Sequence, residues 1–443
     1  MTKKVKVFTK VIIAVVLFTM TFSNIGFAAS NRELIASKDL KSAKLLDMND
    51  VIKIAEYHIG SYLSTDIQTE GKTIIPSKDF INLYDLDDNL FAYLVPLVEV
   101  GKGEIGYITV GAIEDGYDSY QIFIDNNVIN KIRYKLDEKK KEINKKNVKT
   151  KIVFIPPINY IVKVEDDKNT TYFDISNING DEIDVTRNIK EKQQDISKSY
   201  KIIRNEKNKK QIEKITKNLI SDSNSDTFSI TAVTPEDVKL VNEAKGKFVP
   251  VNENGTIRYG GDQEWYTDST RQDRGCGPTA AANITYYLAK KNSTKYGKLY
   301  PQSTINKSDF LTHMNTLYTH INPGVFGETS LSDWTSKVES YAKSKGVTLT
   351  RVTSNASFTL DNTATYIKNG LNADSPVATL NLQPPYTGYG YAWHWMTITK
   401  YFRDTADNRW IAVSSWGERY SINYRTHFDA MKNWLGGGLM YFN

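Results

Sequence analysis

The chain has 443 residues, of which 40% are hydrophobic, a formal net charge of +6 and a single cysteine. This composition is typical of a globular protein of two or three domains, and one thiol excludes a disulfide bond within the chain. Beyond the N-terminal segment, no apolar run is long enough to cross a membrane.

Residues 1–28 have the pattern of a secretory signal peptide. Four lysines between positions 3 and 10 precede an apolar stretch at 11–22, and the small residues Gly26 and Ala28 suit a cleavage site. The apolar stretch is shorter than the roughly 20 residues of a membrane-spanning helix, which would be the alternative. We therefore expect cleavage near Ala28 and a secreted, extracellular protein.

Residues 29–185 predict a small α+β domain. In the segment 48–66, Asn49 or Asp50 can cap a helix whose apolar residues recur at helical spacing, and His58 lies on that apolar face. We expect His58 to be a core histidine with one hydrogen bond. Strand-like runs follow at 80–86, 90–100, 104–113 and 120–125, with turns at 87–89 and 101–103, and a further hairpin is expected over 152–178.

Residues 186–235 are predicted to form a basic, polar helical segment followed by a linker. Apolar residues are sparse before position 220, and the stretch 221–237 is rich in Ser, Asp and Thr. The lysines could bind an anionic cell-wall polymer. The alternative is a solvated helix followed by an exposed cleavage region.

Residues 236–443 differ in composition, because all seven tryptophans and Cys276 lie there. Pro278 suits the first turn of a helix, so Cys276 is expected at a helix N-terminus. Unpaired N–H groups and the helix dipole at that position favour a thiolate and lower the pKa of the thiol. Gly275 and Gly277 would keep side chains away from the sulfur. These features together predict a nucleophile.

A cysteine nucleophile needs a base, and His394 is the best candidate of the five histidines because it begins a strand. A hairpin about the turn at 403–408 would bring residues 414–417 opposite His394. The groups available there are Ser414 and Ser415, with Glu418 and Asp407 farther out, and we expect Ser414 to orient the imidazole. Trp416 could cover that contact. The backbone N–H of Cys276 and the side chain of Gln272 are the expected oxyanion donors, ahead of Asn283.

The motifs Cys-Gly-Pro at 276–278, Pro-Val at 376–377, the strand that begins at His394 and Ser-Ser-Trp-Gly at 414–417 resemble the C39-like division of the papain-type cysteine peptidases. Gly-Glu-Thr-Ser at 327–330 fits the same pattern. The resemblance implies a papain-like catalytic domain over 236–443, with a helix bearing Cys276 and an antiparallel sheet bearing His394. It also implies Gln272 as oxyanion donor. Ser414 stands where Asn or Asp is usual in that family.

The helix and strands of 29–185 resemble the inhibitory prosegments of secreted bacterial papain-type zymogens. The expected function is therefore a secreted thiol hydrolase that cleaves peptide bonds and is made as a latent zymogen. Its partners would be a protein or peptide substrate and its own prosegment as intramolecular inhibitor. We expect a monomer that binds no nucleic acid. No metal or other cofactor is expected either, because the Cys and His residues do not cluster and no Gly-rich phosphate loop is present.

Two alternatives remain open. One is a cell-wall amidase or endopeptidase of the Cys/His type, although such enzymes favour Cys-Ser-Gly where this chain has Cys-Gly-Pro. The other is a catalytically weak or inactive surface-binding protein on a peptidase fold, which Ser414 at the third position and the basic stretches favour.

Overall fold

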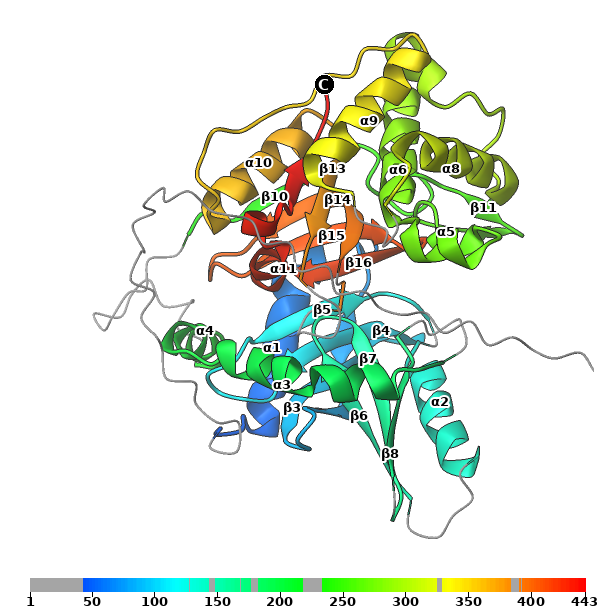
Figure 1. Ribbon diagram of the computed structural model, residues 1–443. Helices are drawn as coiled ribbons and strands as arrows, with labels where there is room; N and C mark the ends of the chain where they lie inside the picture. The colour runs from blue at the N-terminus through cyan, green and yellow to red at the C-terminus, as the bar shows by residue number, and fades with distance from the viewer. Residues whose placement is uncertain are drawn as a thin grey trace, which may run out of the picture. The chain divides into compact units, whose positions relative to one another are not determined.

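The computed structural model describes residues 43–126, 128–142, 148–167, 169–176, 182–217, 233–324, 329–383, 390–391 and 393–443. The predicted signal peptide, most of the predicted linker and residues 327–328 lie outside the described residues. Ser37–Asn443 forms one compact unit. The described residues have an α+β fold, with eleven α-helices packed on a mostly antiparallel sheet of fifteen strands (Figure 1).

The predicted N-terminal helix is α1 (Met48–Ser61), and Asp47 caps it by accepting a hydrogen bond from the backbone N–H of Asp50 at 2.8 Å. The apolar face predicted from the sequence is buried. His58 lies on that face, fully buried, with its Nε2 2.6 Å from Asp118 Oδ2. The prediction of a core histidine with one partner is confirmed within the described residues, because His58 Nδ1 has none there.

The predicted strands form the N-terminal half of the sheet. These are β1 (Ile74–Pro76), β2 (Ile81–Tyr84), β3 (Leu90–Glu99), β4 (Gly103–Gly111), β5 (Ser119–Phe123), β6 (Lys149–Ile155), β7 (Asn159–Glu165), β8 (Thr170–Asp174) and β9 (Ile183–Asp184). Neighbouring strands are antiparallel except β2 and β6, which are parallel. Part of the basic run after β5, for which no helix was predicted, lies in α2 (Val128–Glu142).

The charged segment after β9 contains α3 (Thr186–Ile202) and α4 (Glu206–Thr216). Its apolar residues are few, but those on α3 are buried at Ile189, Ile196 and Tyr200. The Tyr200 hydroxyl donates to the carbonyl of Phe154 at 2.9 Å, which ties α3 to β6. This helix is therefore packed on the sheet rather than fully solvated.

The C-terminal half of the sheet consists of β10 (Glu236–Lys239), β13 (Val377–Asn381), β14 (His394–Arg403), β15 (Arg409–Ser415), β16 (Glu418–Asn423) and β17 (Gly438–Met440). Shorter elements precede its main helices: β11 (Asn252–Glu253), β12 (Thr256–Ile257), α5 (Ser269–Arg274) and α7 (Ser293–Tyr296). The predicted hairpin of β14 and β15 is confirmed.

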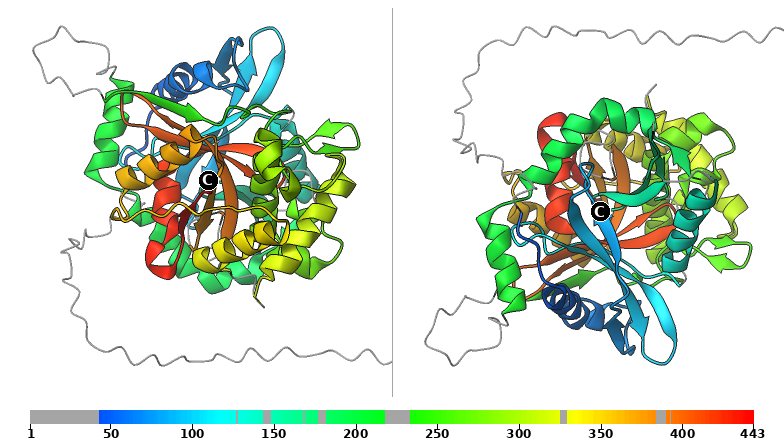
Figure 2. Two further views of the ribbon diagram at one scale, coloured as in Figure 1. Left: turned by 90° about the horizontal axis from the view of Figure 1, so that it is seen from above. Right: turned by 90° about the horizontal axis from the view of Figure 1, so that it is seen from below.

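Helices cover both faces of these strands (Figures 1 and 2). On one face lie α6 (Cys276–Lys291), α8 (Lys307–Ile321) and α9 (Leu331–Ser344), and Trp395 of β14 stacks on Trp334 of α9. On the other lie α10 (Leu360–Asn372) and α11 (Tyr424–Met431), where Thr379 of β13 bonds to His427 at 2.8 Å. The N-terminus of α6 thus meets the beginning of β14.

The two halves share one sheet, because β16 pairs with β5 through Tyr420 and Phe123, Ser421 and Ile122, and Ile422 and Gln121. Each half still has its own apolar core. A third cluster centred on α1 includes Phe402 and Trp410 from the C-terminal half. The segments predicted as prosegment and peptidase domain are therefore joined edge to edge by backbone hydrogen bonds.

Candidate functional site

Cys276 is the first residue of α6, and its side chain is buried. Packing leaves no room for a side chain at Gly275 and little room at Gly277. A Cβ on Gly275 would lie 2.3 Å from the ring of Tyr266, and a Cβ on Gly277 would lie 3.3 Å from Trp395. The Trp334 indole donates to the carbonyl of Gly277 at 2.9 Å, which fixes this first turn against α9.

The structure brings Cys276 and His394 together. Both line one cavity of about 10 Å³. The backbone N–H groups of Trp395, the residue directly after His394, of Gly277 and of Cys276 itself favour the thiolate form of the Cys276 side chain electrostatically. The helix start and the strand start therefore meet at the thiol, and the cavity between them is about the size of one water molecule.

The imidazole of His394 is held on two sides. Its Nε2 lies 2.7 Å from Ser415 Oγ, and Trp416 stacks on the ring with centroids 4.3 Å apart and planes 11° from parallel. Trp416 and Gly417 form the two-residue turn between β15 and β16, with φ values of 47° and 70°. Two positive φ values are typical of the tight turn that matches the twist of a hairpin, and they are costly for tryptophan. The turn sets the indole over His394, as the sequence predicted.

The predicted contact between Ser414 and His394 is wrong. Ser414 Oγ donates to the carbonyl of Tyr259 at 2.6 Å and accepts from Asn283 Nδ2 at 3.2 Å. The cause is a β-bulge in β14 between Ile398 and Lys400, which shifts the pairing so that Thr397 faces Ser414. A shift of one residue turns each side chain to the other face, so Ser415 reaches His394.

Ser414 and Asn283 instead hold the loop that precedes α5. Asn283 Oδ1 also accepts from the backbone N–H of Gly261 at 2.9 Å. Gly260 in this loop has φ +98°, and a Cβ there would lie 2.4 Å from Ser414 Oγ. Asn283 was the second choice of oxyanion donor from the sequence. Its amide instead positions this loop through its bonds to Gly261 and Ser414.

The predicted role of Gln272 does not agree with its contacts. Its Nε2 donates to the carbonyls of Glu264 and Tyr266 at 3.1 and 2.8 Å, and Gln272 is not among the residues that line the cavity. A primary amide has two N–H hydrogens, so both are used. Gln263 does line the cavity, and within the described part of the chain its side chain gives one hydrogen bond, to the carbonyl of Gln272 at 2.9 Å. Gln263 was not predicted from the sequence, although it is a residue of the same type and lies nine positions before Gln272.

The electrostatics of the closed cavity differ from the prediction. Burial raises the pKa of the Cys276 thiol, and the three backbone N–H donors oppose this effect without overcoming it. Burial also lowers the pKa of His394 to about 3. The predicted lowering of the thiol pKa is wrong, and near neutral pH both the Cys276 thiol and the His394 imidazole that line this cavity are uncharged.

Among the described residues, no group of three or more His, Cys, Asp or Glu side chains is placed to hold a metal ion. Of the helices that the structure describes, none combines the length and apolar character needed to span a bilayer. No protein-family model, curated protein or solved structure matches the chain. The resemblance to the C39-like peptidases therefore stays a prediction made from the motifs.

Proposed function

We propose that this protein is a secreted cysteine hydrolase that cleaves peptide bonds and is made in a latent form. One observation carries the proposal: Cys276 at the start of α6 and His394 at the start of β14 line the same cavity. A nucleophile, a base and a group that orients the base are the parts that acyl transfer needs. Ser415 is the third group in this proposal.

The chemistry follows from these positions. The Cys276 sulfur attacks the carbonyl carbon of the substrate, and His394 takes the thiol proton and gives it to the leaving amine. The Cys276 N–H and the second Nε2 hydrogen of Gln263 stabilise the oxyanion. Water then attacks the thioester, and His394 acts as base once more. Ser415 accepts a hydrogen bond from the imidazolium while it exists.

The size of the cavity supports latency. A space of about 10 Å³ admits no peptide. The neutral thiol and imidazole are the inactive protonation state, and both result from burial. We propose that the N-terminal half keeps the site in this state, and that removal of that half allows it to open.

A second candidate is a surface-binding protein on an inactive fold. A hydroxyl at Ser415 in place of a carboxylate or amide, together with the raised thiol pKa, favours this reading. A cell-wall amidase uses the same Cys and His and differs only in substrate. Hydrolysis of casein against hydrolysis of purified peptidoglycan separates the two enzymes.

The test uses the single cysteine, since any thiol label reports on Cys276 alone. Wild type, Cys276→Ala and His394→Ala are purified, and their masses are followed during incubation. We expect wild type to shorten and then to react rapidly with iodoacetamide at pH 6. His394→Ala should stay intact and react slowly, while His320→Ala, an exposed histidine on α8, behaves as wild type. Equal labelling of wild type and His394→Ala, before and after cleavage, would favour the inactive fold.

A further inference from the structure

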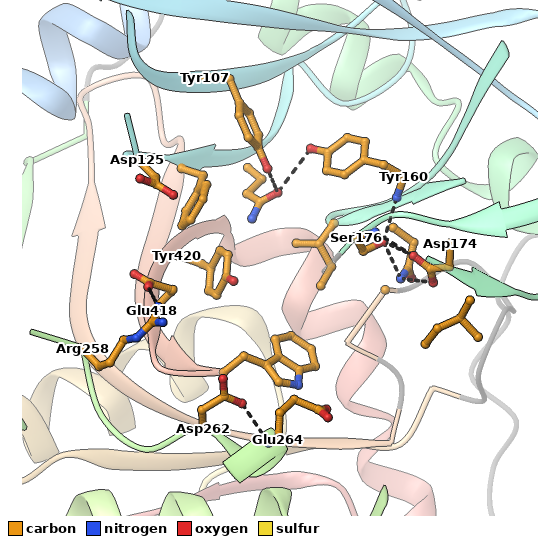
Figure 3. Close-up of a pocket in the computed structure, with 17 residues that line it drawn as sticks. Tyr107, Asp125, Tyr160, Asp174, Ser176, Arg258, Asp262, Glu264, Glu418 and Tyr420 are labelled. Carbon is orange, nitrogen blue, oxygen red and sulfur yellow. Dashed lines mark hydrogen bonds and ion pairs between the residues drawn. The ribbon is translucent and has the colours of Figure 1, made fainter. Parts of the chain in front are cut away.

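A second cavity, of about 290 Å³, lies where the two halves of the chain meet. Tyr107, Tyr160 and Asp174 line it from the N-terminal half, and Arg258, Asp262 and Tyr420 line it from the C-terminal half (Figure 3). Its volume is close to the lower end of the range for small-ligand sites, about 300 to 1,000 Å³. Trp416 lines both this cavity and the one between Cys276 and His394.

The wall of this cavity is acidic, with five carboxylates and one basic side chain. The basic residue, Arg258, is already paired with Glu418 at 2.7 Å and with Glu253 at 2.7 Å. The other four carboxylates make no ion pair with a cation of the described residues; they are Asp125, Asp174, Asp262 and Glu264. Lys131, Lys245 and Arg258 act electrostatically on Asp125, Lys135 acts on Asp174, and Arg258 acts on Asp262, so the negative charge of the wall is compensated only in part by the described chain.

A buried amide points to the same conclusion independently. Gln121 is fully buried and lines the cavity. Its Oε1 accepts from the hydroxyls of Tyr107 and Tyr160 at 3.2 and 3.4 Å, and in Figure 3 both labelled tyrosines converge on one amide. Its Nε2 has no acceptor among the described residues. A buried donor without an acceptor is unfavourable, so the cavity offers an unfilled place for a carbonyl oxygen.

Burial is the largest influence on the pKa values of these acidic groups. Burial raises the pKa of Asp262 to about 6, and burial also raises the pKa values of Asp125, Asp174 and Glu264. A cation placed among them would reverse this shift.

We propose that this cavity binds the basic side chain of a peptide, with the guanidinium or ammonium group among the carboxylates and an adjacent peptide carbonyl at Gln121 Nε2. Binding requires no reaction at Cys276, so the inference is independent of the proposed hydrolysis. The shared Trp416 wall would place the bound residue beside the candidate catalytic cavity. Asp262 and Glu264 flank Gln263, which lines that neighbouring cavity.

The test measures binding to the full chain carrying Cys276→Ala, by titration calorimetry near neutral pH. Nα-acetyl-arginine methylamide carries both the cation and the carbonyl, its citrulline analogue lacks the cation, and butylguanidine keeps the single cation but lacks the peptide carbonyl. We expect the arginine probe to bind about tenfold or more tightly than either of the others, because each lacks one of the two recognised groups. Asp262→Asn keeps an oxygen for the backbone N–H of Glu264 and should weaken binding of the arginine probe, also by about tenfold or more.

Asp137→Asn on α2 removes an exposed acid that does not line the cavity, and should leave binding of the arginine probe unchanged. Equal affinity for the arginine and citrulline probes, or no binding of either, would overturn the proposal. This comparison uses one protein and does not depend on the folding of the Asp262 variant. Butylguanidine binding as tightly as the arginine probe would show a site for free guanidinium compounds and would overturn the assignment to a peptide.

Discussion

The hydroxyl beside His394 is the residue on which the proposed chemistry depends most directly. Ser415→Ala removes the 2.7 Å contact to Nε2, so the ring loses the group that fixes its orientation. We expect the labelling rate of the processed enzyme and its casein hydrolysis to fall about tenfold or more, with a smaller loss of thermal stability than Ser414→Ala causes, because one buried hydrogen bond is lost rather than two.

Ser414→Ala is the matched control, because it deletes the same atom one residue away. It should lower the unfolding temperature, since a buried donor and acceptor pair is lost at Tyr259 and Asn283. Its effect on labelling should be the smaller of the two. The opposite ranking would return the orienting role to Ser414.

Trp416 has a strained backbone conformation, and its indole shields the His394 ring from water. Asparagine tolerates a positive φ better than tryptophan, so Trp416→Asn should keep the turn at φ 47° while it exposes His394 to water. The pKa of His394 should then rise from about 3 toward the ordinary value near 6.5. Histidine NMR in the full chain measures this, and Trp416→Phe, which keeps a ring, should shift less. An unchanged pKa in Trp416→Asn would show that other groups keep His394 dry.

His313 on helix α8 should make the free energy of unfolding depend on pH. This histidine is buried, its Nε2 lies 2.8 Å from Thr285 Oγ1, and burial, aided by Lys345, lowers its pKa to about 3. Between pH 6.5 and 3 the unfolded chain binds a proton that the folded chain does not, so stability falls as the pH falls through this window. Within this window His313 lowers the free energy of unfolding by about 1.4 kcal/mol for each unit by which the pH falls.

Urea unfolding of His313→Gln between about pH 6 and 4 should therefore show a shallower pH dependence than wild type, by about that amount per unit. His320→Gln changes an exposed histidine on the same helix and should follow the wild-type slope. Parallel slopes for His313→Gln and wild type would show that His313 titrates alike in both states.

Local patterns predicted most of these elements. The period of apolar residues predicted α1, alternation and turns predicted the N-terminal strands, and the turn at 403–408 predicted the hairpin of β14 and β15. Cys276 and His394 were identified by residue type and position. The bulge at Ile398 and Lys400 has no such signal, yet it decides between Ser414 and Ser415. Gln272 and Gln263 are residues of the same type close together in the sequence. Tertiary packing decides that Gln263 lines the cavity and that the Gln272 amide bonds to two carbonyls elsewhere.

The junction between the halves was not predictable, because pairing of β16 with β5 joins residues about 300 positions apart. It is reinforced by a buried charge cluster. Asp66, from the N-terminal half, lies 2.7 Å from Arg419 and 3.2 Å from Lys400, and Arg419 lies 2.5 Å from Glu243. All four side chains are almost fully buried. The cations hold the pKa of Asp66 well below its usual range, although burial acts in the opposite direction.

The whole molecule should therefore behave as one unit that depends on Asp66. Asp66→Asn leaves Lys400 and Arg419 buried with less negative charge nearby, and removal of one partner from a buried ion pair costs about 3 to 5 kcal/mol. Urea unfolding should show a loss of this size. Glu213→Gln, which removes the half-exposed pair with Lys217 on α4, should cost less than about 1 kcal/mol.

The same cluster bears on how a latent enzyme could open. If a site-specific protease cuts an inserted site within 218–232, the halves should stay together, because the β5–β16 pairing and the charge cluster do not depend on that segment. Because the folded pKa of Asp66 is depressed, its stabilisation is present above the unfolded value near 3.9 and is lost only as pH falls through the lower folded value. The cut halves should thus co-elute at pH 5 as at pH 7, whereas cut Asp66→Asn should separate and label faster at Cys276. Separation of cut wild type at pH 5 would show that a group other than Asp66 controls release.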